Sequence, residues 1–275
     1  MSANTTSNRT ASPRQLSRNL SPTRDAFSTQ GQAAHSKAGA EQNEVLVAQF
    51  NHRVMINFKI SSRVLAAQLP SGLELLPFRS AFYVTFMATH IRGVKMFGLP
   101  IFPGFNAISL RTYVRSEKDP NVSGTFTFRR YVSSSAGAWL LKKKLGLTAN
   151  VIPIKRKVKS GKGAPLPSVG YLWKIGDADG LLRIKARSQV REGTKESKHG
   201  WMLNHLNEFT VVKNKVVVHK TGKPKCQIYD VAKANFKCGA KRMFGQSFVK
   251  PLENRPGSVY LFNGGKTKFM TGEEL

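Results

Sequence analysis

The chain has 275 residues, 40% of them hydrophobic, which is too apolar for a wholly disordered protein and enough for one sizeable domain. No apolar run approaches the roughly 18 residues of a membrane-spanning helix, so we expect no membrane partner. Lys and Arg number 44 against 15 Asp and Glu, giving a net charge of +29. Such a charge attracts polyanions at low salt, although a merely solvated basic surface would have the same composition.

Two residues, Cys226 and Cys238, are the only cysteines. Their spacing fits none of the usual zinc patterns, so we expect no metal, and no motif in the chain indicates a cofactor. Two lone thiols in a chain of this length are typical of a reducing compartment, which favours a cytoplasmic location.

Residues 1–44 are rich in Ser, Thr, Asn, Gln and Arg and contain few large apolar side chains. They cannot bury enough surface to offset the entropy of ordering, so we interpret them as a disordered polar tail before a domain at 45–275. The start also lacks the apolar region of a secretory signal, whereas an Arg- and Ser-rich, acid-poor segment is typical of organelle import as well, and that alternative stays open.

The first half of the domain is predicted to be mostly strand. Strand-like runs cover 45–50, 54–60 and 81–90, with a short helix at 63–69 that Pro70 ends. Residues 93–106 hold several Gly and Pro and are interpreted as a loop. Because this loop is unusually apolar, we expect it to cover a core, line a pocket or contact a partner.

The second half predicts further short strands and one clear helix at 134–147. Lys213, Asn214 and Lys215 are typical of a hairpin turn. Many short strands with few helices predict a mainly β barrel or sandwich. The predicted strands lie at 108–115, 125–132, 151–159, 171–175, 181–186, 208–212, 216–220 and 226–232.

The helix at 134–147 carries the one pattern that suggests covalent chemistry. At 100° per residue, Lys143 falls on the same arc as Ala136, Trp139, Leu140 and Leu147. A lysine held among apolar groups tends to be neutral, and a neutral amine can form a Schiff base with a ketone. The alternatives are a side chain that extends to water, or a basic helix end that suits the helix dipole.

The segment Lys143-Lys144-Leu145-Gly146 resembles the Lys-Lys-Leu-Gly of acetoacetate decarboxylase. A closer resemblance is to the YqjF-like bacterial family of uncharacterised proteins (domain of unknown function 2071) in the same superfamily. Its motifs match Leu69–Leu75, Ile91–Val94, Ser109–Val114 and Arg255–Tyr260, and the resemblance covers about residues 45–270.

This resemblance implies a cone-shaped, mostly antiparallel β-barrel with a few short helices and an interior pocket. It also implies that Lys143 is the nucleophile and that Lys144 lowers its pKa, a mechanism for which acetoacetate decarboxylase is the standard example. The pocket arginine of that enzyme falls near Asn51, with Arg53 two residues away. No acid stands near Tyr83, where its pocket glutamate would fall.

Two functions follow as hypotheses. The first is a pocket for a small carbonyl or carboxylate ligand, oriented by Arg92, Arg111 and Tyr113; whether Lys143 then makes it a Schiff-base enzyme stays open. Arg111 and Tyr113 are also compatible with a strand ion pair and a core tyrosine.

The second hypothesis is binding of an RNA or DNA backbone, specific or non-specific, through a basic surface. Self-association into a homo-oligomer is a further option. The basic residues concerned are Lys142, Lys143, Lys144, Lys155, Arg156, Lys157, Lys159 and Lys162.

Overall fold

The computed structural model describes residues 44–159, 168–190, 196–205, 207–222 and 226–275. The first described strand, β1 (Glu44–Ile60), begins where the polar tail was predicted to end. The tail lies outside the described residues apart from Glu44, so its disorder and the domain boundary stay predictions.

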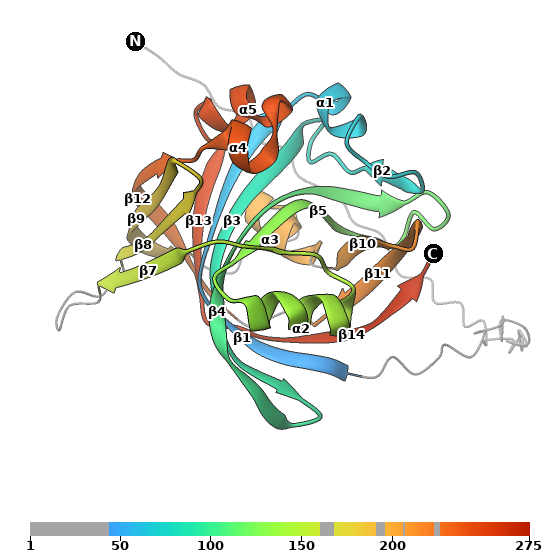
Figure 1. The fold of residues 1–275 in the computed structure, drawn as a ribbon. Coiled ribbons are helices and arrows are strands. Elements are labelled where there is room, and N and C mark those ends of the chain that lie inside the picture. The colour runs from blue at the N-terminus through green and yellow to red at the C-terminus, as the bar shows by residue number, and fades with distance from the viewer. Residues whose placement is uncertain (1–43, 160–167, 191–195, 206, 223–225) are drawn as a thin grey trace, which may run out of the picture. The chain divides into compact units, whose positions relative to one another are not determined.

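Seven of the described strands close into a barrel (Figure 1). The ring closes because β1 pairs with β3 along one side and with β14 through the first half of its other side. All pairings in the ring are antiparallel except the short parallel contact of β5 with β10. In ring order the strands are β1, β3 (Phe82–Met96), β4 (Leu99–Ser116), β5 (Ser123–Val132), β10 (Glu208–Val212), β11 (Lys215–Thr221) and β14 (Lys266–Glu274).

The long strand β1 belongs to two sheets. Its pairing shifts between Asn51 and Val54, where His52 has a positive φ of 48°. Beyond this bulge β1 leaves β14 and pairs with β13, because a bulge bends a strand and changes its direction. The side sheet then runs outward from β13 (Ser258–Asn263) through β12 (Gln227–Lys237), β9 (Ala178–Val190) and β8 (Ser168–Ile175) to β7 (Ile154–Lys159).

The alternation of side chains along β1 separates two environments. Val54, Ile56 and Phe58 are buried in the main apolar core, which also contains side-sheet residues such as Trp173. Met55 and Asn57 project from the opposite face of the strand, because strand side chains alternate. The wall shared by barrel and side sheet is therefore apolar on its outer face and partly polar on its inner face.

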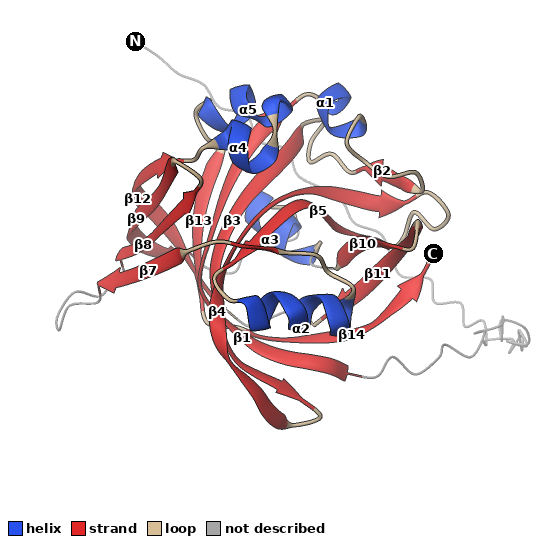
Figure 2. Cartoon of the chain, in the orientation of Figure 1, coloured by secondary structure: helices blue, strands red, loops and turns tan. Residues whose placement is uncertain are grey.

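The fold prediction is confirmed: the described domain is a mainly β barrel with a few short helices (Figure 2). The predicted hairpin turn is also present, since Lys213 and Asn214 both have positive φ between β10 and β11. The remaining elements are α1 (Ser62–Ala66), β2 (Leu73–Leu75), α2 (Ser135–Leu145), β6 (Asn150–Val151), α3 (Lys198–Asn204), α4 (Ala240–Phe244), η1 (Gln246–Phe248) and α5 (Val249–Glu253).

The predicted loop at 93–106 is wrong. These residues form the end of a long hairpin between β3 and β4, with a two-residue turn at Phe97 and Gly98. Pro100 and Pro103 are tolerated because this part of β4 pairs with β3 alone, and pairing with β5 begins only at Ala107. A proline on an unpaired strand edge removes no hydrogen bond from the sheet.

Candidate functional site

A row of polar side chains crosses four neighbouring strands inside the barrel. Asn57 pairs with Thr85, Thr85 with Arg111, and Arg111 with Thr127, on β1, β3, β4 and β5 respectively. Paired residues project from the same face of a sheet, so the four share the inner face. Asn57, Thr85 and Arg111 are all buried. The barrel interior at this level is therefore polar.

Two arginines are buried in this interior. Arg53 is 7% exposed and Arg111 is 5% exposed. The guanidinium of Arg53 lies 4.4 Å from the ring centre of Phe50, and Arg111 Nη2 lies 3.8 Å from the sulfur of Met55. The Nε atoms of both arginines have no hydrogen-bond partner among the described residues. Each such buried donor costs about 1–3 kcal/mol unless something binds it.

Burial dominates the titration of both arginines. Loss of solvation lowers the pKa of Arg53 to about 10, and the nearby charge of Arg111 acts in the same direction. The pKa of Arg111 is also lowered, again chiefly by burial. Both groups keep their charge at neutral pH, so the interior holds two cations that are poorly solvated.

Among the described residues, one carboxylate faces these arginines, that of Glu208 at the start of β10. It forms a short ion pair with Arg130 of β5 and accepts a hydrogen bond of 2.6 Å from Thr127. Burial opposes its ionisation, but Arg130, the Thr127 hydroxyl and Arg111 together outweigh that effect and lower its pKa. Glu208 is therefore ionised at neutral pH.

We call Arg53, Arg111, Arg130 and Glu208 the arginine cluster. Its three cations and one anion leave two positive charges in excess. Buried charges are normally paired, so an excess of this kind is unusual inside a folded domain. Further unpartnered buried hydroxyls lie on the inner faces of β3, β4 and β14, at Thr89, Ser109 and Thr267.

Tyr113 extends the polar interior toward α3. Its hydroxyl lies 3.2 Å from Thr85 Oγ1, which donates a hydrogen bond of 2.7 Å to Asn57. Burial raises the pKa of Tyr113, so the phenol stays protonated. Trp201 of α3 lies 4.6 Å from the Tyr113 ring, centre to centre, and covers this end of the interior.

The model of DUF2071, described as an uncharacterized conserved protein, matches residues 47–261. The chain belongs to the DUF2071 family. No curated protein matches it.

Solved structures place this DUF2071 domain in the acetoacetate-decarboxylase-like fold. MppR, an enduracididine biosynthesis enzyme complexed with pyruvate, aligns with a TM-score of 0.59 at 12% identity, over 86% of this chain and 93% of that one. Acetoacetate decarboxylase from Legionella pneumophila aligns with a TM-score of 0.57 at 13% identity, over 83% and 86%. An acetoacetate-decarboxylase-like enzyme from Sphingomonas wittichii RW1 gives 0.58 at 11%, over 85% and 93%.

The structure brings together two of the three predicted ligand-orienting residues. Arg111 and Tyr113 both face the barrel interior. Arg92 is exposed and projects from the opposite face of β3 from Thr85, because the two positions are an odd number of residues apart. Arg92 therefore does not join the other two.

The orientation predicted for Lys143 is wrong. Lys143 and Lys144 are exposed, as is Trp139, and the buried residues of α2 include Gly137 and Leu140. The reason is the close approach at Gly137, where a Cβ would lie only 2.8 Å from the Phe105 ring. The helix packs against the barrel through Gly137, and the face of α2 that carries Lys143 is therefore turned toward water.

Sequence reasoning missed Glu208. It sought an acid near Tyr83, in the first half of the chain, whereas Glu208 reaches the site from β10 through the contact of β10 with β5. The available signal was an isolated acid at the start of a predicted strand in a very basic chain. Arg53, considered as a substitute for Asn51, does lie in the interior.

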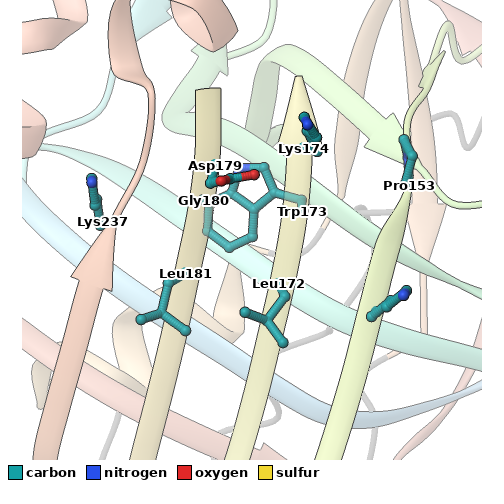
Figure 3. A pocket seen from close by; sticks show the side chains of 9 residues that line it. Pro153, Leu172, Trp173, Lys174, Asp179, Gly180, Leu181 and Lys237 are labelled. Atoms are coloured by element: carbon teal, nitrogen blue, oxygen red, sulfur yellow. The ribbon is translucent and has the colours of Figure 1, made fainter. Parts of the chain in front are cut away.

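The DUF2071 domain also has a shallow hollow on the outer face of the side sheet, with a volume of about 490 Å³ (Figure 3). Leu172 and Leu181 form its floor, and Lys174, Asp179 and Lys237 surround them (Figure 3). It is lined from β7, β8, β9 and β12, and it contains no residue of the arginine cluster. Lysines at its edge add to the basic surface on which the hypothesis of polyanion binding depends.

Proposed function

We propose that the barrel interior binds a small carboxylate or keto acid, with Arg53 and Arg111 as the groups that hold its negative charge. The observation that carries this proposal is the excess of buried positive charge together with the unpartnered Nε atoms of these two arginines. Guanidinium groups pair with carboxylates through two parallel hydrogen bonds, and such pairs are strongest where water is excluded.

The fold supports the same class of ligand. MppR, which shares the fold, has been solved with pyruvate. The proposal for this chain is non-covalent binding, because the buried polar residues of its described part include arginines but no lysine. The exposed position of Lys143 gives a Schiff base no support.

The test is a ligand-dependent thermal shift on the full chain. Pyruvate, acetoacetate and longer β-keto acids are compared with uncharged ketones of the same length. At 100 times the dissociation constant, a ligand stabilises the folded state by about 2.7 kcal/mol, which raises Tm by several degrees. We expect this rise with the acids and not with the ketones.

Two arginine variants separate binding from structure. Arg111→Met removes a cluster arginine, and Arg129→Met removes an exposed arginine of the adjacent strand. We expect Arg111→Met to lose the shift while its ligand-free Tm stays equal or rises, since it relieves charge repulsion. Arg129→Met should keep the shift. A full shift in Arg111→Met, or no shift with any acid, would contradict the proposal.

A second function, polyanion binding, is favoured by the outer face of the side sheet. Lys157, Lys159 and Arg183 line a hollow of about 260 Å³ there, and no acid is among its lining residues in the described part. Sheet alternation places Lys155 on the same face of β7 as Lys157 and Lys159. The exposed lysines of β7 thus occur at every second residue on one face of the strand, an arrangement that suits contacts with successive phosphates. Lys162, predicted to belong to this patch, lies outside the described residues.

Salt-resistant retention on immobilised RNA, DNA and heparin tests the second function. Lys157→Glu/Lys159→Glu/Arg183→Glu is compared with Lys142→Glu/Lys143→Glu/Lys144→Glu, which changes the same number of charges on α2. Specific use of the side sheet predicts elution above about 0.15 M salt for the wild type and the α2 variant, and earlier elution for the side-sheet variant. Equal loss in both variants would leave only non-specific attraction.

A further inference from the structure

The end of the β3–β4 hairpin exposes large apolar side chains to water. Phe97 is 77% exposed and Leu99 is 68% exposed, and Ile101 follows on the same strand as Leu99. The hairpin extends beyond α2 at the lower edge of the barrel (Figure 1). Scattered apolar residues are common on protein surfaces, but a cluster of this kind usually marks an interaction site.

Helix α2 adds a tryptophan to this surface. Trp139 is 60% exposed, and it lines a hollow of about 320 Å³ together with Met96, Ile101 and Phe102 of the hairpin. Lys144 lines the same hollow. The hairpin tip and the outer face of α2 therefore form one continuous surface, which we call the hairpin–helix surface: Phe97, Leu99, Ile101 and Trp139 with the basic residues around them.

The conformation of the tip sets Phe97 apart from an ordinary turn residue. Phe97 and Gly98 are the two central residues of the turn, with φ of 49° and 78°. Turns of this kind favour Asn, Asp or Gly at both positions, because bulky side chains are strained at positive φ. A phenylalanine at this position lowers the stability and the solubility of the protein. Its presence is better explained by contact with another molecule than by the needs of folding.

The charged residues of the hairpin end and of α2 are all basic. Arg92 and Lys95 are exposed on the hairpin, and Lys142, Lys143 and Lys144 are exposed at the end of α2. In the sequence, no Asp or Glu occurs from 76 to 116 or from 120 to 176, the two stretches that supply this surface. The surface thus combines an apolar tip, an interfacial tryptophan and a ring of cations.

We propose that the hairpin–helix surface docks the protein on an anionic lipid bilayer. Phe97, Leu99 and Trp139 would enter the interface between headgroups and acyl chains, where aromatic rings are favoured. The five basic residues would lie against anionic headgroups, which attract Lys and Arg near such a surface. This is surface docking, because no helix in the described part of the chain is long and apolar enough to cross a membrane.

A bilayer fits this surface better than a folded partner does. A stable protein interface needs a broad, shape-complementary area, whereas a projecting hairpin end offers a narrow tip that a fluid lipid layer can accommodate. The proposal revises the expectation of no membrane partner, since that expectation rested only on the lack of a spanning segment. It is independent of ligand binding inside the barrel.

Vesicle flotation with the full chain tests the proposal. We expect binding to phosphatidylcholine vesicles that contain phosphatidylserine, and much weaker binding to phosphatidylcholine alone. Phe97→Ser/Leu99→Ser should weaken binding at least about tenfold, since two large apolar side chains would no longer be buried in the lipid. The control Leu172→Ser/Val211→Ser removes exposed apolar residues elsewhere, which are 38% and 40% exposed, and should bind like the wild type.

Fluorescence locates the contact directly. Of the three tryptophans, Trp173 is buried and Trp201 is half-buried, so an emission change on vesicle binding should come from Trp139. We expect a blue shift and quenching by lipids brominated on their acyl chains, both lost in Trp139→Phe. Lys142→Glu/Lys143→Glu/Lys144→Glu should remove the preference for anionic lipid.

Three results would overturn the proposal. The first is unchanged flotation of the Phe97→Ser/Leu99→Ser variant. The second is no binding of the wild type to anionic vesicles, with light scattering showing a dimer that the same variant dissociates, which would make the surface a contact between two copies. The third is vesicle binding lost only in the side-sheet charge variant.

Discussion

The barrel interior and the hairpin–helix surface break the ordinary rule of burial in opposite directions. The interior buries Arg53 and Arg111 with too few acids to neutralise them, whereas the surface exposes Phe97, Leu99 and Trp139 to water. Folding alone would favour the reverse arrangement in both places. We propose that each region is completed by something that the folded chain does not itself supply: an anion in one case, an apolar layer in the other.

The two regions differ in how strongly the rest of the fold depends on them. In the arginine cluster, Glu208 is held by an ion pair to Arg130 and a hydrogen bond from Thr127 across the strands of the barrel, so changing Glu208 disturbs stability. The hairpin tip makes few contacts with the remainder of the domain, so changing it should affect binding alone. Variants in the two regions should therefore differ in their effect on stability.

Glu208→Gln should cause the largest loss of stability. It removes the only carboxylate of the arginine cluster and leaves Arg130 without its ion-pair partner. Breaking a buried pair from one side costs about 3–5 kcal/mol, and we expect a value near the lower end because Glu208 keeps some exposure. Urea unfolding measures the difference. A loss below about 1 kcal/mol would mean that the cluster is better solvated than its burial indicates.

The pH dependence of that variant provides a control. The pKa of Glu208 is lowered in the folded state, so its stabilisation is present above the unfolded value near 4.5 and is lost as pH falls through the folded value. The wild type should lose stability over this range more steeply than Glu208→Gln.

Gly137→Ala should destabilise the protein by about 1–2 kcal/mol. The added Cβ would meet the buried Phe105 ring at 2.8 Å and force α2 away from the barrel. At an ordinary helix position the same change would stabilise the protein by roughly 0.5–1 kcal/mol. The sign of the change in the free energy of unfolding therefore shows whether α2 packs against the barrel through this glycine. Thermal unfolding and the emission of Trp139 report the result.

Acid should also weaken the domain through His52, at the bulge where the two sheets separate. Burial and the nearby cations Arg156, His90 and Arg92 lower the pKa of His52 to about 4. In the unfolded chain His52 binds a proton near pH 6.5, whereas in the folded protein it does so only near pH 4. As the pH falls from 6.5 toward 4, protonation therefore favours the unfolded chain, and the stability that is present above pH 6.5 is progressively lost. His52→Asn, which tolerates the positive φ, should flatten stability between these values. An unchanged slope would exclude His52 as the cause.

Phe97→Ser/Leu99→Ser should change the free energy of unfolding by less than about 0.5 kcal/mol, because neither side chain is buried in the folded state. Calorimetry or urea unfolding is sufficient to check this. A loss of more than about 1 kcal/mol would show that the tip supports the barrel, and the contrast with the interior would fail.

Local patterns were enough to predict much of the fold. The runs at 54–60, 108–115 and 208–212 are strands in the structure, and the helix predicted at 134–147 is present as Ser135–Leu145, with Ser134 and Gly146 as its caps. These features depend on alternation, capping and backbone preference, which neighbouring residues decide among themselves. Together with the resemblance, they also predicted the barrel that the structure confirms.

The site required the tertiary structure. Strand alternation within the sequence is enough to place Arg111 and Tyr113 on one face of a strand, and composition and local patterns make the chain basic and mainly β. The pairing of distant strands is what turns this face into the inside of a barrel and brings Glu208 to it from nearly 100 residues away along the chain. The tertiary structure also turned Lys143 outward, because Phe105 leaves room for no more than a glycine at 137. Strand pairing and helix docking depend on contacts between distant segments, which no local pattern records.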